Sequence, residues 1–403
     1  IDEASDRERF ENFAKRAGLR MPRGTTGTSS DDVRMAVEEI GFPVLIRPSY
    51  VLGGRGMEIL SNQEQLDAYL KEAYLAPDKP LLVDEYLGHA TELDVDAACD
   101  GEEVLIGAIM EHLEEAGIHS GDSTCFIPTQ NVPEEILEKV REQTKIIGLG
   151  LKIRGCYNIQ FAIQGNDLYV LEVNPRSSRT VPFVAKSSGL PLARIAANIT
   201  IGIPLSKQVI PIRTSGQICV KAPVFPFIKL RGLDPAPGPE MKSTGEVFGS
   251  DDTADLAYLK ARLATEVPVA TSGGAYLTVR DQDKKNLLHS ANKLKELGFI
   301  LYATPGTADY LREQNIPVEV VYRIRESKHP DALDLMRQGK ISFIVNVPTV
   351  SGGAVRDGNM MRRLAVELNI PFVTTIRGAN MEVAAIAAQQ KGKLEPRRLK
   401  VNY

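Results

Sequence analysis

The sequence predicts an α+β domain with an antiparallel sheet up to about residue 205, followed by an α/β domain with a parallel sheet from about residue 267. In the first part, several β-rich runs follow one another with short turns between them. In the last part, short apolar runs alternate strictly with longer amphipathic runs, which is typical of a parallel sheet with helices on both faces. Residues 206–266 are rich in Pro and Gly and weakly periodic, so they predict a connecting segment of loops and short strands.

The bulk composition is that of an ordinary globular protein. The chain has 403 residues, a length that favours about two to four domains, and a net charge of -4. No apolar run is long enough to cross a bilayer, and the charge balance indicates neither a nucleic-acid partner nor a membrane surface. The four cysteines form no CxxC pair, so we expect reduced, buried thiols and a cytoplasmic location. The chain begins without Met or a signal peptide, and we expect it to be a piece of a longer polypeptide.

Two helices of the first domain carry clear start signals. Ser29 precedes an amphipathic run that ends at Gly41, which is typical of a capped helix with a glycine stop. Ser61 to Glu64 has the pattern of a capping box, and the helix after it has an apolar stripe. The stripe consists of Leu66, Tyr69, Leu70 and Ala73.

Three successive strands are expected in PLLVDEYL, TELDVDAACD and EVLIGAIMEH, between residues 80 and 112. After them, NIQFAIQGNDLYVLEVN has the pattern of a hairpin, with two β-rich runs around residues 164–167. Because strands joined by hairpins run antiparallel, the sheet of the first domain is expected to be antiparallel.

The hairpin places three oxygen-bearing side chains on one face of the sheet. Glu172 and Asn174 are two positions apart on one strand and point the same way, and Gln160 can face them from the other strand. Such a set suits a hard divalent cation whose coordination is completed by phosphates. Arg176 follows closely and would add a positive charge beside the metal. A solvated sheet face is the alternative, which we disfavour because the apolar neighbours mark this hairpin as core.

Two further polar clusters precede the hairpin. Glu92, Asp94 and Asp96 alternate along one strand and share a face, and for Asp94 and Asp96 a solvent-exposed face is the alternative. The segment EEAGIHSGDS, residues 114–123, offers backbone amides, an imidazole and a hydroxyl between two glycines. That combination suits an anion or a nucleotide ribose-phosphate, with a structural His in a Gly-Ser loop as the alternative.

The stretch RPSYVLGGRGMEI, residues 47–59, follows a buried strand and predicts a polyphosphate-binding loop. It does not match GxxxxGK[ST], so it is not a Walker-type phosphate cradle. With Arg47 at its base and Arg55 at its tip, a glycine-rich loop between two strands can fold down on a nucleotide triphosphate. A surface turn with incidental arginines is the alternative.

In combination, these motifs resemble the ATP-grasp fold, and specifically the family of carbamoyl-phosphate synthetase large chains. RPSYVLGGRGMEI, EEAGIHSGDS, NIQFAI, LEVNPRSSRTVPFVAKSSG and GPEMKSTGEV match its pattern, and the resemblance covers essentially the whole chain. RPSYVLGGR is typical of the family's second synthetase half, which phosphorylates carbamate. The resemblance implies an ATP-grasp domain at 1–205, a connecting segment at 206–266, and a Rossmann-like, methylglyoxal-synthase-like allosteric domain at 267–403.

The resemblance also implies roles for individual residues. Nucleotide contacts fall on Arg7, Arg47, Glu85, Leu87, Glu92, Gly117, Ile118, His119 and Ser120, beside Gly53, Gly54 and Arg55 of the loop and the metal-bound Gln160 and Glu172. Divalent-metal ligands fall on Gln160, Glu172 and Asn174, and Arg47 and Arg176 are the implied catalytic residues that meet the transferred phosphate. Glu85 departs from relatives with a His there, and its carboxylate would accept from ribose hydroxyls. The implied cofactors are ATP and two Mg²⁺ or Mn²⁺ ions, with a K⁺ near Glu92, His112 and Glu114.

The implied activity is transfer of the γ-phosphate of ATP to carbamate, which forms carbamoyl phosphate for pyrimidine and arginine synthesis. The implied partners are a glutaminase small subunit and the N-terminal half of the large chain, without nucleic acid or membrane. Two alternatives stay open. One is an incomplete piece that binds nucleotide and effector but turns over poorly or not at all. The other is a different ATP-grasp carboxylase or ligase, such as biotin carboxylase, against which the C-terminal domain and GPEMKSTGEV argue.

The C-terminal domain is expected to bind a mononucleotide rather than to catalyse a reaction. The strand FILYAT ends at Thr304 and a helix begins at Thr307, and anions bind where a strand end meets a helix N-terminus. By resemblance, Thr304, Thr307 and Arg323 contact the phosphate of UMP or a similar nucleotide, and Asn346 lies near the same crevice. An ordinary capped turn is the alternative.

Ornithine, which activates some members of the family, is expected to bind poorly. Glu114 and Asp122 of the family's ornithine site are present, but Ala222 replaces an acid that helps to hold the ligand's ammonium group.

Overall fold

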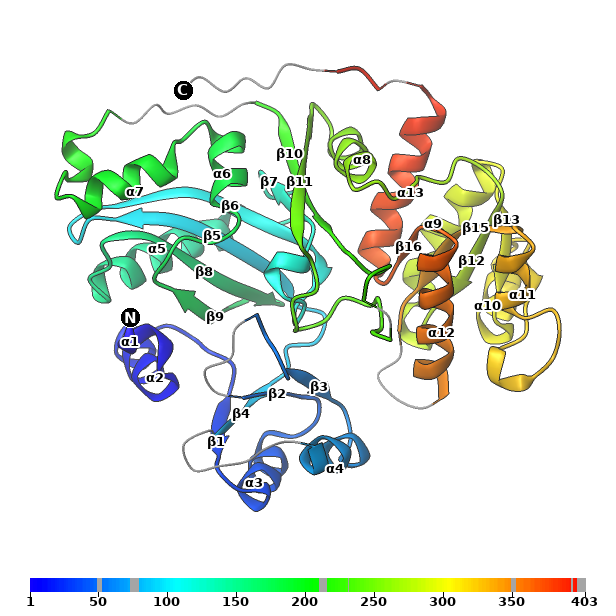
Figure 1. Ribbon diagram of the computed structural model, residues 1–403, viewed down its shortest axis with the longest axis horizontal. Coiled ribbons are helices and arrows are strands. Elements are labelled where there is room, and N and C mark those ends of the chain that lie inside the picture. Colours follow the sequence, from blue (N-terminus) through cyan, green and yellow to red (C-terminus); the bar gives the residue numbers. More distant parts are fainter. Residues whose placement is uncertain are drawn as a thin grey trace. The chain divides into compact units, whose positions relative to one another are not determined.

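The computed structural model describes residues 1–48, 53–72, 80–209, 216–230, 232–348, 353–392 and 394–396 (Figure 1). These residues form two compact units. The first contains residues 1–221 and 238–241, and the second contains residues 222–237 and 242–396. The short stretch 238–241 thus packs with the first unit, although the residues on both sides of it belong to the second.

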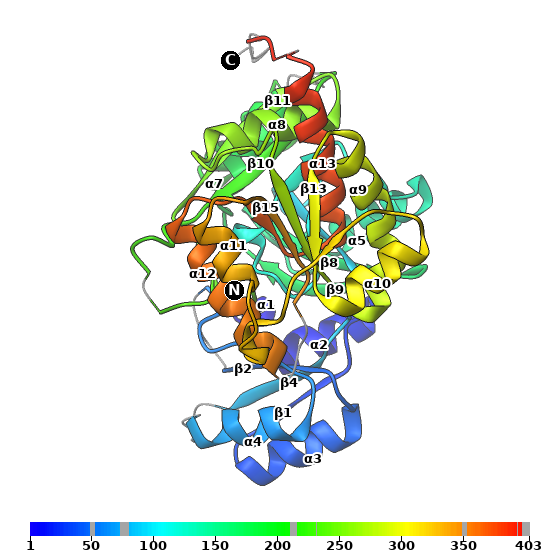
Figure 2. The ribbon, with the colours of Figure 1, turned by 90° about the vertical axis from the view of Figure 1, so that its right-hand side faces the viewer.

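A small antiparallel sheet of the first unit has the strand order β1-β4-β2-β3. Its strands are β1 (Gly24–Gly27), β2 (Val44–Pro48), β3 (Glu58–Leu60) and β4 (Leu81–Glu85). Helices α3 (Ser30–Ile40) and α4 (Gln63–Glu72) pack on the same side of this sheet around one apolar core (Figures 1 and 2). The connection from β2 to β3 is the predicted phosphate loop, of which residues 49–52 lie outside the described part of the chain.

The starts of these helices follow the predicted chemistry with one change. Helix α3 has the predicted cap at Ser29 and the predicted stop at Gly41. The cap of α4 is Asn62 rather than Ser61, because Asn62 Oδ1 accepts a hydrogen bond from a backbone N–H of the first turn at 3.0 Å. The predicted apolar stripe of α4 packs in the core as far as it is described, and Ala73 lies outside the described residues.

A larger antiparallel sheet of the first unit contains the strand order β10-β7-β6-β5-β8-β9. Its strands are β5 (Thr91–Cys99), β6 (Val104–Glu115), β7 (Cys125–Ile127), β8 (Gly155–Gln164), β9 (Asp167–Asn174) and β10 (Ile218–Val224). Helices α2 (Arg7–Arg16) and α5 (Glu134–Gly150) share an apolar core with this sheet, and α6 (Val181–Ser188) and α7 (Leu192–Thr200) pack against β5, β6 and β8. The short helices of this unit are α1 (Asp2–Ser5), η1 (Ser120–Asp122) and η2 (Leu205–Lys207).

The second unit contains a sheet with the order β14-β13-β12-β15-β16, and its parallel pairing confirms the prediction. The strands are β12 (Gly274–Thr278), β13 (Ile300–Ala303), β14 (Glu319–Val320), β15 (Ile341–Asn346) and β16 (Phe372–Val373). The helices are η3 (Asp281–Asp283), α9 (Lys284–Glu296), α10 (Pro305–Glu313), η4 (Ile324–Glu326), α11 (Ala332–Arg337), α12 (Gly353–Glu367) and α13 (Ile376–Gln390). The strand order reverses between β12 and β15, which is where open α/β sheets commonly bind ligands.

The three strands expected between residues 80 and 112 are present as β4, β5 and β6. Strand β4 pairs with β1 and β2 in the small sheet, because Leu81 and Val83 point into the core under α3 and α4. Two predictions about single elements are wrong. The segment VEVVYRI forms only the two-residue β14, whose side chains are exposed at the edge of the sheet. The connecting segment contains a regular helix, α8 (Ala254–Ala264), after β11 (Gly245–Asp251), because side chains such as Ala257, Leu259 and Ala261 form a buried face.

All four cysteines are free and buried, as predicted. Among the described helices, none is both long enough and apolar enough to cross a membrane.

Candidate functional site

Strand β5 carries three acidic side chains on one face of the large sheet. Glu92, Asp94 and Asp96 are 2%, 1% and 1% exposed, so the solvent-exposed alternative for Asp94 and Asp96 is wrong. The residues between and after them pack in the apolar core with α2 and α5. Strand alternation therefore turns the acids to the opposite face, where burial makes each of them depend on polar partners.

The predicted metal ligands meet on the hairpin of β8 and β9. Gln160 lies opposite Glu172 in the strand pairing, and Asn174 Nδ2 donates to Glu172 Oε1 at 2.7 Å. Arg176 is exposed, and its guanidinium donates to Asn174 Oδ1 at 3.2 Å. One carboxylate and two amide oxygens on one face form the hard-ligand set that Mg²⁺ or Mn²⁺ accepts. The residues present thus fit a divalent cation.

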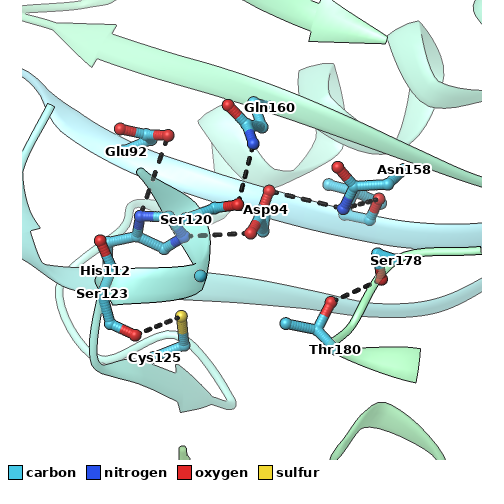
Figure 3. A network of polar contacts seen from close by, with 12 residues as sticks. Glu92, Asp94, His112, Ser120, Ser123, Cys125, Asn158, Gln160, Ser178 and Thr180 are labelled. Atoms are coloured by element: carbon cyan, nitrogen blue, oxygen red, sulfur yellow. Dashed lines mark hydrogen bonds and ion pairs between the residues drawn. The ribbon is translucent and has the colours of Figure 1, made fainter. Parts of the chain in front are cut away.

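A buried histidine lies beside the acids of β5. His112 Nε2 lies 3.3 Å from Asp94 Oδ2, and His112 Nδ1 lies 3.9 Å from Glu92 Oε1 (Figure 3). Burial raises the pKa of Glu92 to about 7, although His112 opposes that shift. Glu114 lies two positions beyond His112 on β6, and its Oε2 accepts from the backbone N–H of Thr124 at 2.6 Å. The three residues implied for a K⁺ are therefore neighbours in the fold.

The turn after β6 contacts one of the predicted metal ligands. Its residues Gly117–Ser120 were all expected to contact nucleotide, and Ser120 Oγ accepts from Gln160 Nε2 at 3.0 Å (Figure 3). His119 Nδ1 accepts from the backbone N–H of Gly121 at 3.0 Å, and burial lowers the pKa of His119. A neutral imidazole with one nitrogen engaged by the turn leaves its other nitrogen for a ligand.

Gly117 is required by the packing of this turn. Its φ is +93°, and a Cβ there would lie 2.7 Å from the ring of Tyr86. The Tyr86 hydroxyl donates to the carbonyl of Ala116 at 2.9 Å, so the ring is held against the turn.

Lys221 contacts the predicted nucleotide turn, which the sequence did not reveal. It is 0% exposed, and its Nζ donates to the main-chain carbonyl of Ser120 at 2.9 Å. A lysine inside the apolar strand ICVKAPV is a possible signal, since a buried ammonium group needs a polar partner.

The glycine turn of the predicted phosphate loop is held by the stretch 238–241. Gly53 O accepts from the backbone N–H of Met241 at 2.9 Å. Gly54 has a φ of +70°, and a Cβ there would lie only 2.0 Å from the carbonyl oxygen of Pro239. Arg55 is exposed at the tip of the turn, as predicted. The same stretch contacts the other predicted nucleotide segment, because His119 N donates to the carbonyl of Gly238 at 2.9 Å in the same unit.

Asp84 joins two of the arginines that were expected to contact nucleotide. Asp84 Oδ1 lies 2.8 Å from a terminal guanidinium nitrogen of Arg7, and Asp84 Oδ2 lies 3.4 Å from Arg47 Nε. Asp84 is 6% exposed, so its carboxylate balances two positive charges in a poorly solvated place. The sequence suggested Glu85 for this region, and the adjacent Asp84 was missed because only the sheet pairing brings it to the arginines.

Glu85 and Leu87 lie at the end of β4 and just beyond it. Glu85 Oε2 accepts from Arg23 Nε at 3.0 Å and is one-third exposed. Leu87 belongs to a small apolar cluster with Ala90, Ala116 and Ala162. A carboxylate beside an apolar surface can accept ribose hydroxyls while the surface receives a base.

The predicted effector residues of the second unit lie around the N-terminus of α10. This helix begins at Pro305 rather than at the expected Thr307. Thr304 is its N-cap residue without a side-chain cap hydrogen bond, and its hydroxyl donates to the hydroxyl of the buried Thr307 at 3.4 Å. Lys284, which no sequence pattern indicates, lies close by: its Nζ would lie 3.4 Å from a Cβ at Gly306, and it pairs with the exposed Asp281 at 2.7 Å. Lys284 and the helix N-terminus both favour an anion there. Arg323 is half-buried at the start of η4.

Asn346 ends β15 and is engaged by a buried arginine. Asn346 Oδ1 accepts from Arg362, which is 1% exposed. Asp234 accepts from Arg362 through both carboxylate oxygens, at 2.8 Å and 2.5 Å. Burial opposes the charged form of Asp234, but the bonds from Arg362 outweigh it and lower the pKa of Asp234.

Comparison with known proteins shows the family of the chain. The family model described as "Carbamoyl-phosphate synthase L chain, ATP binding domain" matches residues 6–208, and that of the MGS-like domain matches residues 286–374. A Methanocaldococcus jannaschii protein named carbamoyl phosphate synthase large chain, C-terminal section, is 46% identical over 98% of this chain and 66% of its own length. The carbamoyl phosphate synthase large chain of Archaeoglobus fulgidus is 45% identical over 98% of this chain and 37% of its own length. The chain thus spans only part of these relatives.

Solved structures show the same fold at low identity. The biotin carboxylase domain of Hydrogenobacter thermophilus 2-oxoglutarate carboxylase, in complex with MgADP, matches with a TM-score of 0.53 and 17% identity over 66% of each chain. An N5-carboxyaminoimidazole ribonucleotide synthetase in complex with ADP matches with a TM-score of 0.53 and 14% identity, over 66% of this chain and 71% of that one. These similarities concern the fold alone.

Proposed function

This chain belongs to the family of carbamoyl phosphate synthase large chains, and we propose that its first unit transfers the γ-phosphate of ATP to carbamate. The products would be carbamoyl phosphate and ADP. The observation that carries the proposal is the oxygen cluster of Gln160, Glu172 and Asn174, with Arg176 hydrogen-bonded to Asn174 at its edge. On a sheet face that is merely solvated, there is no reason for a carboxylate, two half-buried amides and an arginine to lie together.

The residues of the chain would act by positioning and by neutralising charge, because phosphoryl transfer needs little covalent chemistry from the protein. Two divalent ions bound by Gln160, Glu172 and Asn174 would neutralise phosphate charge. Arg47 and Arg176 would hold phosphate oxygens by charge-assisted hydrogen bonds. The amides of the glycine turn, Gly53–Gly56, would cover the polyphosphate. A K⁺ beside Glu92, His112 and Glu114 would offset the cost of burying two carboxylates.

The nucleoside would bind next to the turn that carries His119 and Ser120. The apolar cluster around Leu87 suits the base, and Glu85 suits the ribose hydroxyls. Ser120 links this subsite to the metal ligands through its hydrogen bond from Gln160. The nucleoside and phosphate subsites are thus continuous.

We also propose that the second unit binds a mononucleotide effector such as UMP at the N-terminus of α10. Thr304, Thr307, Lys284 and Arg323 are the groups that would receive the phosphate. The expected partners are a glutaminase small subunit and the family's other synthetase half, and the activity is expected to serve pyrimidine and arginine synthesis.

The reverse half-reaction tests the proposed function directly, because it avoids the unstable carbamate. The purified chain is incubated with MgADP and carbamoyl phosphate, and ATP is measured with luciferase. We expect ATP to form above the uncatalysed rate, with none when EDTA replaces the metal. Tight MgADP binding without ATP formation would contradict the catalytic proposal. It would favour the alternative in which the chain binds nucleotide without catalysis.

A further inference from the structure

Asp96 is a buried carboxylate that has no part in the nucleotide and metal contacts proposed above. It is 1% exposed on β5, and three side chains donate hydrogen bonds to it. Ser178 Oγ donates to the carboxylate, with its two oxygens at 2.7 Å and 2.9 Å. Thr180 Oγ1 donates at 2.5 Å, and Asn158 Nδ2 donates at 3.0 Å. Figure 3 shows that Ser178 and Thr180 also contact each other, so they form one cluster.

Two of these donors lie on the segment that carries Arg176. This segment, Pro175–Thr180, joins β9 to α6. Within the described residues, the Arg176 guanidinium donates to Asn174 Oδ1 and Ser177 O, both at 3.2 Å and both within two positions along the chain. These local bonds orient the Arg176 guanidinium, but they do not anchor its segment to the sheet. The bonds from Ser178 and Thr180 to Asp96 connect the segment to β5, since Asp96 is 80 or more positions away in sequence. Arg179 adds a bond from its guanidinium to the carbonyl of Gly121 at 3.0 Å.

Asp96 also reaches the other end of the segment. Asn158 on β8 pairs with Asp96 on one side and with Asn174 on the other. Its side-chain amide donates to Asp96, while its backbone neighbour Asn174 holds Arg176. The Asp96 carboxylate is therefore linked to both ends of the segment. It is linked to the start through Asn158 of β8 and to the end through the two hydroxyls.

The burial of this carboxylate is unfavourable by itself. Removing the charge from water raises the pKa of Asp96 to about 6, against the hydrogen bonds that favour its ionised form. An apolar residue would fill the same space without this cost, whereas only an acceptor can hold two hydroxyls and an amide together. The presence of a carboxylate at position 96 is therefore better explained by the hydrogen bonds that it accepts than by core packing.

We propose that Asp96 is a positioning residue that holds Pro175–Thr180 so that Arg176 faces the transferred phosphate. The role of Arg176 in this inference rests on the proposed function. Asp96 itself contacts neither nucleotide nor metal; it acts through Ser178 and Thr180.

Hydrogen exchange of the whole chain tests the anchoring part without requiring activity. In Asp96→Asn, amides 176–180 should exchange at least about fivefold faster than in the wild type. Asp100→Asn is the matched control: this carboxylate follows the same strand and accepts backbone hydrogen bonds, but from Glu102, Glu103 and Leu205. It should leave 176–180 within about twofold. Unchanged exchange in Asp96→Asn would overturn the inference, whatever the activity of the chain.

The half-reaction with MgADP and carbamoyl phosphate then tests the link to Arg176. Asp96→Asn should lower kcat at least about tenfold and change the KM for MgADP less than threefold. In an Arg176→Ala background, the same change should lower kcat less than twofold. A purely structural role predicts equal loss in both backgrounds and would contradict the proposal.

Two further outcomes keep the inference separate from the proposed function. If Asp96→Asn fails to fold, Ser178→Ala and Thr180→Ala test the same contacts, and each should speed exchange at 176–180. If the wild type forms no ATP but Asp96→Asn speeds that exchange, the proposed function fails and the anchoring role stands.

Discussion

Asn174 Nδ2 donates to Glu172 Oε1 at 2.7 Å, and this bond joins two side chains on the same face of β9. The bond connects Glu172, the only acid among the predicted metal ligands, to the side-chain amide of Asn174, which also accepts a hydrogen bond from Arg176. The carboxylate of Glu172 is thereby oriented before any cation binds. Preorganised ligands lower the cost of ordering a metal site.

Glu172→Gln should abolish most metal-dependent activity. The change keeps the shape but removes the one negative charge of the set, so ATP formation should fall more than a hundredfold, about 2.7 kcal/mol. The control is Asp167→Asn at the exposed start of β9, whose carboxylate pairs with the exposed Arg20. It should stay within about twofold. A Glu172→Gln rate within threefold of wild type would show that Glu172 is not a ligand.

Gly54→Ala should damage the glycine turn more than Gly53→Ala. Both residues have positive φ, +70° and +63°, so both changes carry the cost of left-handed backbone, about 1–2 kcal/mol. At Gly54 the new Cβ would also meet Pro239 O at 2.0 Å, whereas at Gly53 the nearest atom is a Met241 carbon at 3.6 Å. We expect MgADP affinity by calorimetry to fall at least about tenfold more for Gly54→Ala. Equal losses would contradict the proposed role of the contact with residues 238–241.

Asp84→Asn should destabilise the first unit. It removes the carboxylate between Arg7 and Arg47 and leaves two poorly solvated guanidinium groups without their shared partner. The free energy of unfolding in urea should fall by about 2 kcal/mol or more. Glu11→Gln is the control, since Glu11 pairs with Arg7 one helical turn away and is more exposed; it should cost under about 0.5 kcal/mol. The reverse order of these two effects would contradict the bridging role of Asp84.

Lys284→Ala and Thr307→Ala should each weaken UMP binding by the second unit. Lys284 supplies charge and Thr307 a hydroxyl beside the N-terminus of α10, and we expect at least about tenfold weaker binding from each in titration calorimetry. Lys285→Ala is the charge-matched control, because Lys285 is the next residue of α9 and is exposed. No heat with UMP at millimolar concentration for the wild type, or unchanged affinity in Thr307→Ala, would rule out this effector site.

The stability of the protein should depend on pH through Asp96. Its folded pKa of about 6 lies above its usual 3.8, so folding favours the protonated carboxyl. This contribution is complete below about pH 3.8 and is lost as pH rises through about 6. Relative to Asp96→Asn, the wild type should therefore lose on the order of 3 kcal/mol of unfolding free energy between pH 4 and pH 6.5. A flat difference in urea unfolding across this window would contradict the assigned protonation.

The hairpin of β8 and β9 was predictable because its information is local. Alternation along a strand places Glu172 and Asn174 on one face, and a short turn brings Gln160 opposite Glu172. The same holds for the Ser29 cap of α3. It also holds for the parallel sheet of the second unit, because strictly alternating strands and helices are compatible with few sheet topologies. The shared face of the three predicted metal ligands could therefore be inferred without knowing the fold.

The sequence by itself determined the domain types, the shared face of Gln160, Glu172 and Asn174, and the family, because strand period, turn residues and motif spacing act over a few neighbouring positions. Tertiary structure alone decided that Asp96 is buried under Ser178 and Thr180, that Asp84 lies between two arginines, and that Pro239 closes on Gly54. These contacts join residues far apart in the chain, and no local pattern encodes which distant side chain will arrive. The burial of a polar group, and hence its need for a partner, is set only when the sheets and helices have packed.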